Sequence, residues 1–512
     1  MRRQTFRDVL TAIALSNLLL LRTWAELLTP HGRGAYFLNA SRATFVAVMV
    51  NVILLGLAGA AAVTLSRRSS QPHWLTVGKY AFLGLLIIPL EQLRGQLGIR
   101  LADLLAWLGH APGLGKVTLA IVFLGVVYEL LRRRHLVVRA ASTLVLFSCP
   151  FVAVTFARAT WAAATFTPPA PSSTKPTGST ANTGSSHTGS RVVVLVFDEL
   201  DQRLAFDDRP PDVSLPQLDR LRSASLYAPH VAPAGSRTEI SMPALITSRP
   251  IAAVSPQGPD ELGLSYVGVD SVVPWSRQSN LFARAHELGA RTGLVGWYHP
   301  YCRVLAGDLD RCFWEPFYTV ISRDASQGVI GNMIEQLGSL WPWTSRRIYI
   351  GIYQRTLDSA QAMATDSTLG LVLLHLPMPH LPPVYDRHAS GFTLHKYGYD
   401  GYLDNLVLMD HALGALRGSL EAAGWWDRTT LVLTSDHAFR EATRIDGRQD
   451  RRVPFLIKVA GQKEGVTYSA PFDTFVLDDL VIAVIRGEGR TPPEIVALLD
   501  RLRTHAVGQD RR

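Results

Sequence analysis

Acidic and histidine side chains follow three short apolar runs in the C-terminal part of this 512-residue chain. They are Asp198 and Glu199 after the first run, His375 and His380 at the second, and Asp436 and His437 after the third. Carboxylates and imidazoles together form an O/N ligand set for one divalent cation, and this set suits Zn or Mn better than Mg or Ca. A single acidic residue after a strand is often a turn or cap residue. Three such run ends together predict a metal site.

A candidate nucleophile lies in the segment 233–249, which begins as a loop and turns helical near Ile240. The hydroxyl groups of Ser236, Thr238 and Ser241 fall close to the start of that helix, where an anionic group is favoured. Alternatively, these hydroxyls only cap the helix. The residue types alone leave both interpretations open.

The apolar runs are rich in β-branched residues, which is typical of fully buried parallel strands. The runs are 191–197, 292–297, 369–375 and 430–434. Helical patterns such as 403–422 separate them, so we expect one α/β domain over residues 191–505 with a mostly parallel central sheet. Ligands of such sheets gather at the carboxyl ends of the strands, where the acidic and histidine residues stand.

The N-terminal 165 residues differ in composition and predict a helical membrane domain. They hold 17 Lys and Arg against 5 Asp and Glu, whereas the rest of the chain holds 34 against 37. The basic surplus therefore follows membrane topology, and we expect no nucleic-acid partner. Five apolar stretches approach the length of about 20 residues that a spanning helix needs. They are 6–28, 43–65, 77–93, 117–131 and 136–157.

The positive charges predict the orientation of these five spans. They concentrate before the first span, between the second and third, and between the fourth and fifth. If these segments are cytoplasmic, the N-terminus is inside and everything after residue 158 is outside. A signal peptide is the rival for the first stretch, and a soluble helical bundle is the rival for the whole region. Residues 166–190, rich in Pro, Ser, Thr and Gly, predict a flexible linker.

The chain has three cysteines. On this topology Cys302 and Cys312 lie outside the membrane, where an oxidising compartment allows them to form a disulfide across a short loop. Cys149 lies in the fifth span, so we expect a free, buried thiol.

Four ordered motifs in residues 191–490 resemble the sulfatase branch of the alkaline-phosphatase superfamily. Val192–Asp201 is similar to the opening strand that ends in metal-binding acids, and Thr238–Arg249 has the register of the sulfatase nucleophile motif. His375–Pro382 is similar to the PHxP loop and to the LHxxxxHGP loop of phosphoethanolamine transferases. Leu433–His437, followed by Arg452–Phe455, is similar to the SDHG and RVP elements.

Departures from the sulfatase pattern narrow the expected activity. The sulfatase nucleophile is a Cys or Ser oxidised to formylglycine, whereas this register holds Thr238, and Met242 replaces the Arg of the motif. A threonine nucleophile resembles the pattern of phosphoethanolamine and lipoteichoic-acid-type phosphoglycerol transferases, which also carry five membrane spans. Two-metal relatives add an Asp where this chain has Leu376, and a later His that is represented only by His505. We therefore expect a single metal.

The resemblance implies a role for each candidate residue. Glu199, Asp436 and His437 would bind the metal, with Asp198 as a further ligand or their hydrogen-bond partner. Thr238 would be the fourth ligand and the nucleophile, because a free threonine hydroxyl is too weakly acidic to attack at neutral pH. His380 would bind the phosphoryl oxygens or protonate the leaving alcohol. Two residues have a second interpretation: His375 binds substrate or is a hydrogen-bonded core histidine, and Arg237 clamps an anion or is solvated.

The expected protein is a membrane-anchored phosphotransferase. It would move a phospho-alcohol headgroup from a membrane lipid donor to a cell-envelope glycan or lipid acceptor through a covalent phosphothreonine. Its catalytic domain would lie on the periplasmic or extracellular side of a bacterial-type cytoplasmic membrane. Two alternatives remain: a sulfuric- or phosphoric-ester hydrolase with water as acceptor, and a non-catalytic membrane protein with a degenerate site.

Overall fold

The computed structural model describes residues 2–29, 36, 40–68, 72–99, 103, 107–108, 112–166, 191–317, 327–341 and 343–509. The chain forms two compact units, and each takes segments from more than one region of the sequence. The first unit contains residues 1–33, 38–168 and 319–345, and the second contains 34–37, 169–318 and 346–512. Residues 167–190, which include nearly all of the predicted linker, lie outside the described part of the chain.

The first unit is helical. Its helices are α1 (Arg2–Leu19), α2 (Leu21–Leu28), α3 (Arg42–Arg68), α4 (Pro72–Leu85), α5 (Ile87–Gln96), α7 (Gly113–Arg132), α8 (Arg134–Phe147), α9 (Cys149–Thr165) and α14 (Val329–Gly338). Three helical segments are long and apolar enough to cross a membrane: α3, α7, and α8 with α9 as one 32-residue segment. The pair α1 and α2, bent by 60°, makes a fourth if it counts as one span. The stretch 77–93, expected as a span, is divided between α4 and α5 and is not among these candidates within the described residues.

The second unit is built on a nine-stranded sheet. The strands are β1 (Arg191–Asp198), β2 (Leu226–Ala232), β6 (Thr292–Tyr298), β7 (Arg311–Pro316), β8 (Leu371–Pro379), β11 (Thr429–Ser435), β12 (Val453–Lys458), β13 (Val466–Thr467) and β14 (Phe472–Asp473). Their order is β13-β2-β12-β11-β1-β8-β6-β7, with β14 also paired to β2. The block β11-β1-β8-β6-β7 is parallel throughout, whereas β12 runs antiparallel to both of its neighbours. The expected mostly parallel α/β sheet is confirmed.

The remaining elements of this unit surround the sheet. The helices and turns are η1 (Arg203–Asp207), α10 (Pro216–Arg222), α11 (Thr238–Thr247), η2 (Trp275–Arg277), α12 (Leu281–Glu287), α13 (Tyr301–Val304), α15 (Thr344–Ala364), α16 (Gly401–Ala422), η3 (Trp426–Arg428), α17 (Thr443–Asp446), α18 (Val476–Ile485) and α19 (Pro492–Gln509). A three-stranded sheet contains β3 (Ile251–Pro256), β4 (Leu262–Tyr266) and β5 (Val272–Pro274), and β9 (Tyr385–Asp386) pairs with β10 (Gly391–Phe392).

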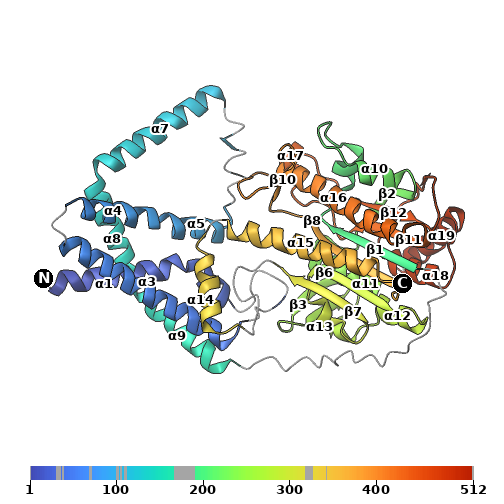
Figure 1. Cartoon of the computed structure of the whole chain (residues 1–512), viewed down its shortest axis with the longest axis horizontal. Helices are drawn as coiled ribbons and strands as arrows, with labels where there is room; N and C mark the ends of the chain where they lie inside the picture. The colour runs from blue at the N-terminus through green and yellow to red at the C-terminus, as the bar shows by residue number, and fades with distance from the viewer. Residues whose placement is uncertain are drawn as a thin grey trace. The chain divides into compact units, whose positions relative to one another are not determined.

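Strand β1 lies inside the sheet and is buried on both faces. Its side chains alternate, as the pleat of a strand requires. Val193 and Leu195 line a small space together with residues of α16, whereas Val192, Val194 and Val196 belong to the core cluster that contains residues of α11, α12 and α18. Figure 1 shows α16 and α12 on opposite sides of the sheet. This two-sided burial explains why the sequence of β1 is a continuous apolar run rather than an alternating one.

The parallel register aligns the carboxyl ends of three adjacent strands. Val196 of β1 is paired with Thr434 of β11 and with His375 of β8. The residues that follow these positions therefore meet at one edge of the sheet, and the same edge holds Asp198 and Asp436. The three polar run ends seen in the sequence are neighbours in space.

Candidate active site

The end of β1 supplies two buried carboxylates, Asp198 and Glu199. Glu199 has a φ of 65°, a left-handed conformation that is uncommon for a residue with a side chain. Hydrogen bonds hold its peptide: the Glu199 N–H donates to Asp436 Oδ1 (3.1 Å), and the Tyr402 hydroxyl donates to the Glu199 carbonyl (2.8 Å). Contacts from β11 and α16 therefore fix the turn that directs both carboxylates to this end of the sheet.

The end of β11 supplies Asp436 and His437, both fully buried. Asp436 Oδ1 also accepts from the His437 N–H at 2.7 Å, which leaves Oδ2 for other partners. His437 Nδ1 lies 3.0 Å from the Ala438 carbonyl oxygen, which can only accept, so Nδ1 carries a proton. In the neutral ring Nε2 then keeps its lone pair. This is the arrangement that a metal-binding histidine needs.

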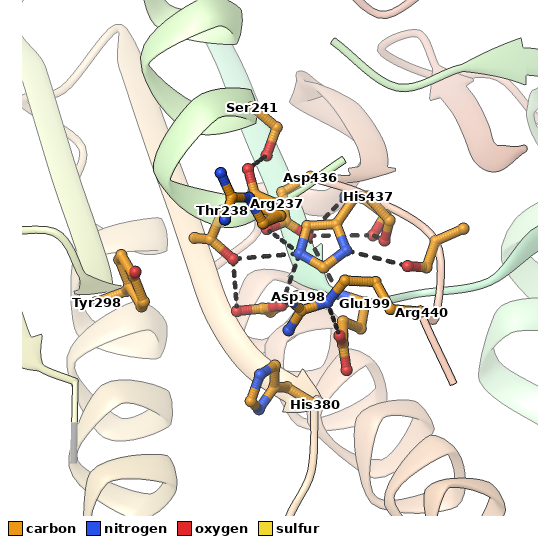
Figure 2. Close-up of polar contacts among 12 residues, drawn as sticks. Asp198, Glu199, Arg237, Thr238, Ser241, Tyr298, His380, Asp436, His437 and Arg440 are labelled. Carbon is orange, nitrogen blue, oxygen red and sulfur yellow. Dashed lines mark hydrogen bonds and ion pairs between the residues drawn. The ribbon is translucent and has the colours of Figure 1, made fainter. Parts of the chain in front are cut away.

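Thr238 is the first residue of α11, and its side chain meets both strand ends. Thr238 Oγ1 donates to Asp198 Oδ2 at 3.4 Å and lies 3.3 Å from His437 Nε2. Figure 2 shows the hydroxyl directed into the cluster, away from the backbone of its own helix. Arg237, the residue before it, takes the N-cap position in an extended conformation. The helix N-terminus thus presents the hydroxyl where an anion would be favoured.

Electrostatics at the site favour a bound cation. Burial, and then the charges of Asp436 and Glu199, raise the pKa of Asp198 well above its usual value. Asp198 Oδ1 and Asp436 Oδ2 accept no hydrogen bond from the described residues. Two adjacent buried carboxylates with free oxygens are costly without a positive partner. The residues present therefore fit a divalent metal.

His375 lies with these carboxylates. Asp198, His375 and Asp436 each offer one ligand atom, and these atoms lie within 4.8 Å of one another. Burial lowers the pKa of His375, and its Nδ1 lies 2.9 Å from the Tyr301 hydroxyl. The sequence left His375 between substrate binding and a core role. The structure places a ligand atom of His375 close enough to those of Asp198 and Asp436, two of the expected metal-binding residues, for all three to bind one ion.

Glu199 and Arg440 form an ion pair beside this cluster. Arg440 Nε donates to Glu199 Oε1 at 2.9 Å, and about half of the Arg440 side chain is exposed. Burial would raise the pKa of Glu199, but nearby basic groups outweigh it and lower the pKa, and among them Arg440 acts through both its charge and its hydrogen bond. Glu199 therefore stays a carboxylate. Sequence reasoning missed Arg440, although its position three residues after His437 in the loop that follows β11 was a usable signal.

Within the described residues, the side chains of the other two candidates, His380 and Arg237, form no hydrogen bond or ion pair with the cluster. His380 follows β8, and its ring packs edge-on against Trp297 with the ring centroids 5.4 Å apart. Burial lowers the pKa of His380, and its Nδ1 accepts no hydrogen bond from any residue that the structure describes. Figure 2 shows this ring facing Glu199 and Asp198 across a gap. The Arg237 side chain is half exposed and pairs with Glu239 at 3.1 Å.

The backbone of Thr238 contacts His299, a histidine that the sequence analysis did not select. His299 is fully buried, and its Nε2 lies 2.9 Å from the carbonyl oxygen of Thr238. Its Nδ1 lies 2.7 Å from the hydroxyl of Tyr36. Burial lowers the pKa of His299 to about 3, so the ring is neutral near pH 7. Tyr36 belongs to the second unit, although helices α2 and α3 of the first unit flank it in the chain.

A disulfide joins Cys302 and Cys312, whose Cα atoms are 5.5 Å apart. It connects α13 with β7, close in sequence to His299. Cys149 is a free thiol and is partly, not fully, buried.

Comparison with known proteins identifies the class of this α/β domain. The family model described as Sulfatase matches residues 190–481, more than half of the chain. The chain therefore belongs to the sulfatase family, as the four motifs predicted. No curated protein sequence matches it significantly.

Solved structures that match part of this chain have low sequence identity to it. Ps i-CgsB has 18% identity and a TM-score of 0.43, covering 58% of this chain and 72% of that one. PsFucS1 sulfatase from Pseudoalteromonas sp. has 16% identity and a TM-score of 0.42, covering 58% and 68%. Phosphonate monoester hydrolase SpPMH from Silicibacter pomeroyi has 16% identity and a TM-score of 0.36, covering 58% and 73%.

Proposed function

We propose that the protein is a membrane-anchored, metal-dependent phosphotransferase with Thr238 as its nucleophile. It takes a phospho-alcohol headgroup from a membrane lipid and transfers it to a cell-envelope glycan or lipid. The observation that carries the proposal is the position of Thr238 Oγ1 at the start of α11, 3.3 Å from His437 Nε2 and 3.4 Å from Asp198 Oδ2. A hydroxyl among candidate metal ligands has the surroundings that activation of a weak nucleophile requires.

The reaction takes two displacement steps. Thr238 gives its proton to water, its Oγ1 forms a bond to phosphorus, and the phosphorus–oxygen bond to the lipid alcohol breaks. The diacylglycerol oxygen takes a proton from water, and diacylglycerol leaves. The acceptor hydroxyl then attacks the phosphothreonine, which restores the Thr238 hydroxyl. A divalent metal bound by the carboxylates and His437 would lower the pKa of the Thr238 hydroxyl and neutralise charge on the phosphoryl oxygens.

His380 is suited to binding the phosphoryl group. Its lowered pKa keeps the imidazole neutral near pH 7. A neutral ring donates one N–H bond but is a poor source of a proton for a leaving alkoxide. We therefore assign His380 to the phosphoryl oxygens rather than to protonation of the leaving alcohol.

A membrane location supports a lipid donor. Helix α7 exposes large apolar side chains along its length, among them Ile121, Phe123 and Leu124. Such a surface is unfavourable in water and is typical of a segment that contacts lipid. We propose five spans with α1 and α2 as the first and the catalytic unit outside the cytoplasm. The disulfide between Cys302 and Cys312 agrees with that compartment.

The membership of the sulfatase family favours one other function on the same site. In that alternative, water rather than an envelope alcohol attacks the intermediate, and the protein is a phosphoric- or sulfuric-ester hydrolase. A phosphoric-ester hydrolase differs from the transferase only in the acceptor, and a sulfuric-ester hydrolase differs also in the transferred group, so the substrate and the products distinguish these functions.

The test uses the full chain in vesicles that contain fluorescent phosphatidylethanolamine and phosphatidylglycerol. The wild type should release fluorescent diacylglycerol, and intact-mass spectrometry should detect a headgroup phosphate on Thr238. Thr238→Ala should abolish both signals, whereas Thr238→Ser should retain part of the turnover because it keeps the hydroxyl. Thr247→Ala is the matched control, because it removes a buried hydroxyl at the other end of the same helix, where it donates to Pro243.

Two outcomes would overturn the proposal. Diacylglycerol release by Thr238→Ala at the wild-type rate would remove Thr238 from the mechanism. Release of free headgroup phosphate at an undiminished rate, without transfer to any added envelope alcohol, would establish the hydrolase instead.

A further inference from the structure

Helix α14 lies between β7 and α15 in sequence, among the elements of the catalytic unit, yet it belongs to the helical unit. It packs on α3, one of the candidate membrane spans. Asn51 of α3 donates to the Gln336 side-chain oxygen (3.0 Å) and to the Met333 carbonyl (3.1 Å), and Gln336 donates to the Thr44 carbonyl (3.0 Å). Hydrogen bonds of this kind fix one helix against another inside a membrane protein.

The orientation of α14 is the reverse of that of a helix on a water-soluble protein. Its polar residues Asn332 and Gln336 are buried. Its apolar residues Ile330 and Ile334 are 73% and 67% exposed, and Trp341, just beyond the helix, is 59% exposed. The spacing of four residues puts Ile330 and Ile334 on one side of the helix, and Trp341 follows in the turn that continues from its C-terminus. In water this arrangement exposes apolar surface and buries polar groups.

The proposed topology and a pair of tryptophans indicate what covers this face. The contacts of α14 with Thr44 and Asn51 lie in the first half of α3, the end of that helix that our topology puts on the outer side of the membrane. Residues after 158 lie on the same side in that topology. Trp341 and Trp343 pack edge-on at the end of α14, with ring centroids 5.7 Å apart. Tryptophan is enriched where a helix meets the lipid headgroups.

We propose that the face formed by Ile330, Ile334 and Trp341 inserts into the outer interfacial layer of the lipid bilayer. Helix α14 then lies in the plane of the membrane and contacts lipid, although in sequence it stands among the elements of the catalytic unit. Figure 1 shows α14 crossing α3 rather than running along it, as an in-plane helix beside a spanning helix does. This inference rests on the proposed membrane anchoring and extends it to a helix that is too short to span the membrane.

The test measures the surroundings of single labelled positions in the full chain reconstituted in phospholipid nanodiscs. Cys149→Ser removes the free thiol, and a spin label is attached through Ile334→Cys. Leu124→Cys on α7 is the lipid control, and Lys463→Cys, an exposed site in the second unit, is the water control. Collision of the label with oxygen, which dissolves in lipid, is compared with collision with a water-soluble nickel chelate.

The label at residue 334 should resemble the label at 124, with oxygen collisions several-fold favoured over the chelate, and the label at 463 should show the reverse. A lipid signal at 124 with a water signal at 334 would overturn the inference and leave the anchoring intact. Water signals at both positions would overturn the anchoring itself. A label at 334 shielded from both reagents would show that a protein, either a partner or a second copy, covers this face.

Discussion

Tyr36→Phe should slow turnover without direct contact with substrate. His299 Nε2 faces the Thr238 carbonyl oxygen, which can only accept, so the neutral ring carries its proton on Nε2. Nδ1 is therefore an acceptor, and the Tyr36 hydroxyl, whose pKa is raised by burial, donates to it over 2.7 Å. The phenol thus fixes the tautomer of His299 that hydrogen-bonds to the backbone of Thr238, the proposed nucleophile.

The size of the effect follows from the bond that is lost. The variant leaves His299 Nδ1 without its donor in a fully buried ring, which costs about 1–3 kcal/mol. Because Tyr36 itself is only partly buried, water can replace some of this, and about 1–2 kcal/mol is the better figure. If the whole loss appears at the transition state, kcat falls about 5- to 30-fold with little change in KM.

The assay is release of diacylglycerol from labelled lipid, with the thermal midpoint of each variant measured in parallel. Tyr353→Phe is the matched control, because it removes a buried phenol hydroxyl whose bond to the Leu408 carbonyl is far from the nucleophile. His299→Gln keeps an N–H for the Thr238 carbonyl and should make turnover insensitive to Tyr36→Phe. Equal kcat values for Tyr36→Phe and Tyr353→Phe at equal stability would refute the positioning role.

Three further predictions concern charge. Arg440→Ala should lower kcat/KM for an anionic phosphodiester by about tenfold or more, because it removes a charged donor beside Glu199. Arg440→Lys should recover part of the lost kcat/KM. Unchanged kinetics of Arg440→Ala would contradict a contact between Arg440 and the anionic substrate. Asp436→Asn should reduce bound divalent metal, measured by elemental analysis, while Asp478→Asn, a buried carboxylate elsewhere, should not. Burial raises the pKa of Asp478 to about 7 in the folded protein, above an unfolded value of about 3.9. The contribution of this carboxyl group to the free energy of unfolding is therefore fully present below pH 4 and is lost as the pH rises through 7. The stability of Asp478→Asn relative to the wild type, followed by thermal midpoints from pH 4.5 to 8, should therefore increase with pH by about 3 kcal/mol, and parallel curves would contradict the assignment.

Sequence reasoning succeeded where chemistry-bearing residues directly follow buried strands. The sequence Val-Phe-Asp-Glu at the end of β1 and Thr-Ser-Asp-His at the end of β11 are local patterns, and a parallel register necessarily brings such ends together. Thr238 was selected from its register in the sulfatase-like motif, and α11 begins at that residue, two residues before the expected start near Ile240. These parts of the site depend on short-range sequence and on one rule of sheet geometry.

The parts that sequence reasoning missed depend on contacts between distant segments. Tyr36 and His299 are 263 residues apart, and only the folded chain shows that one donates to the other. The burial of Gln336 in α14 likewise depends on Asn51, which is 285 residues away. A polar residue in a short helix predicts solvent exposure when its partner is unknown, so the reversed orientation of α14 could not be read from its own residues.

The interleaving of the two units has a consequence for dissecting the protein. A cut after residue 190 removes every preceding helix, and with them Tyr36, which belongs to the catalytic unit. It also leaves α14 attached to the catalytic half without Asn51 and Thr44, so that Gln336 loses its partners while Ile330 and Ile334 remain exposed. We therefore expect a fragment that starts at residue 191 to aggregate unless residues 319–345 are replaced by a short polar loop. The chain passes from one unit to the other at five places, and the linker contains only one of them.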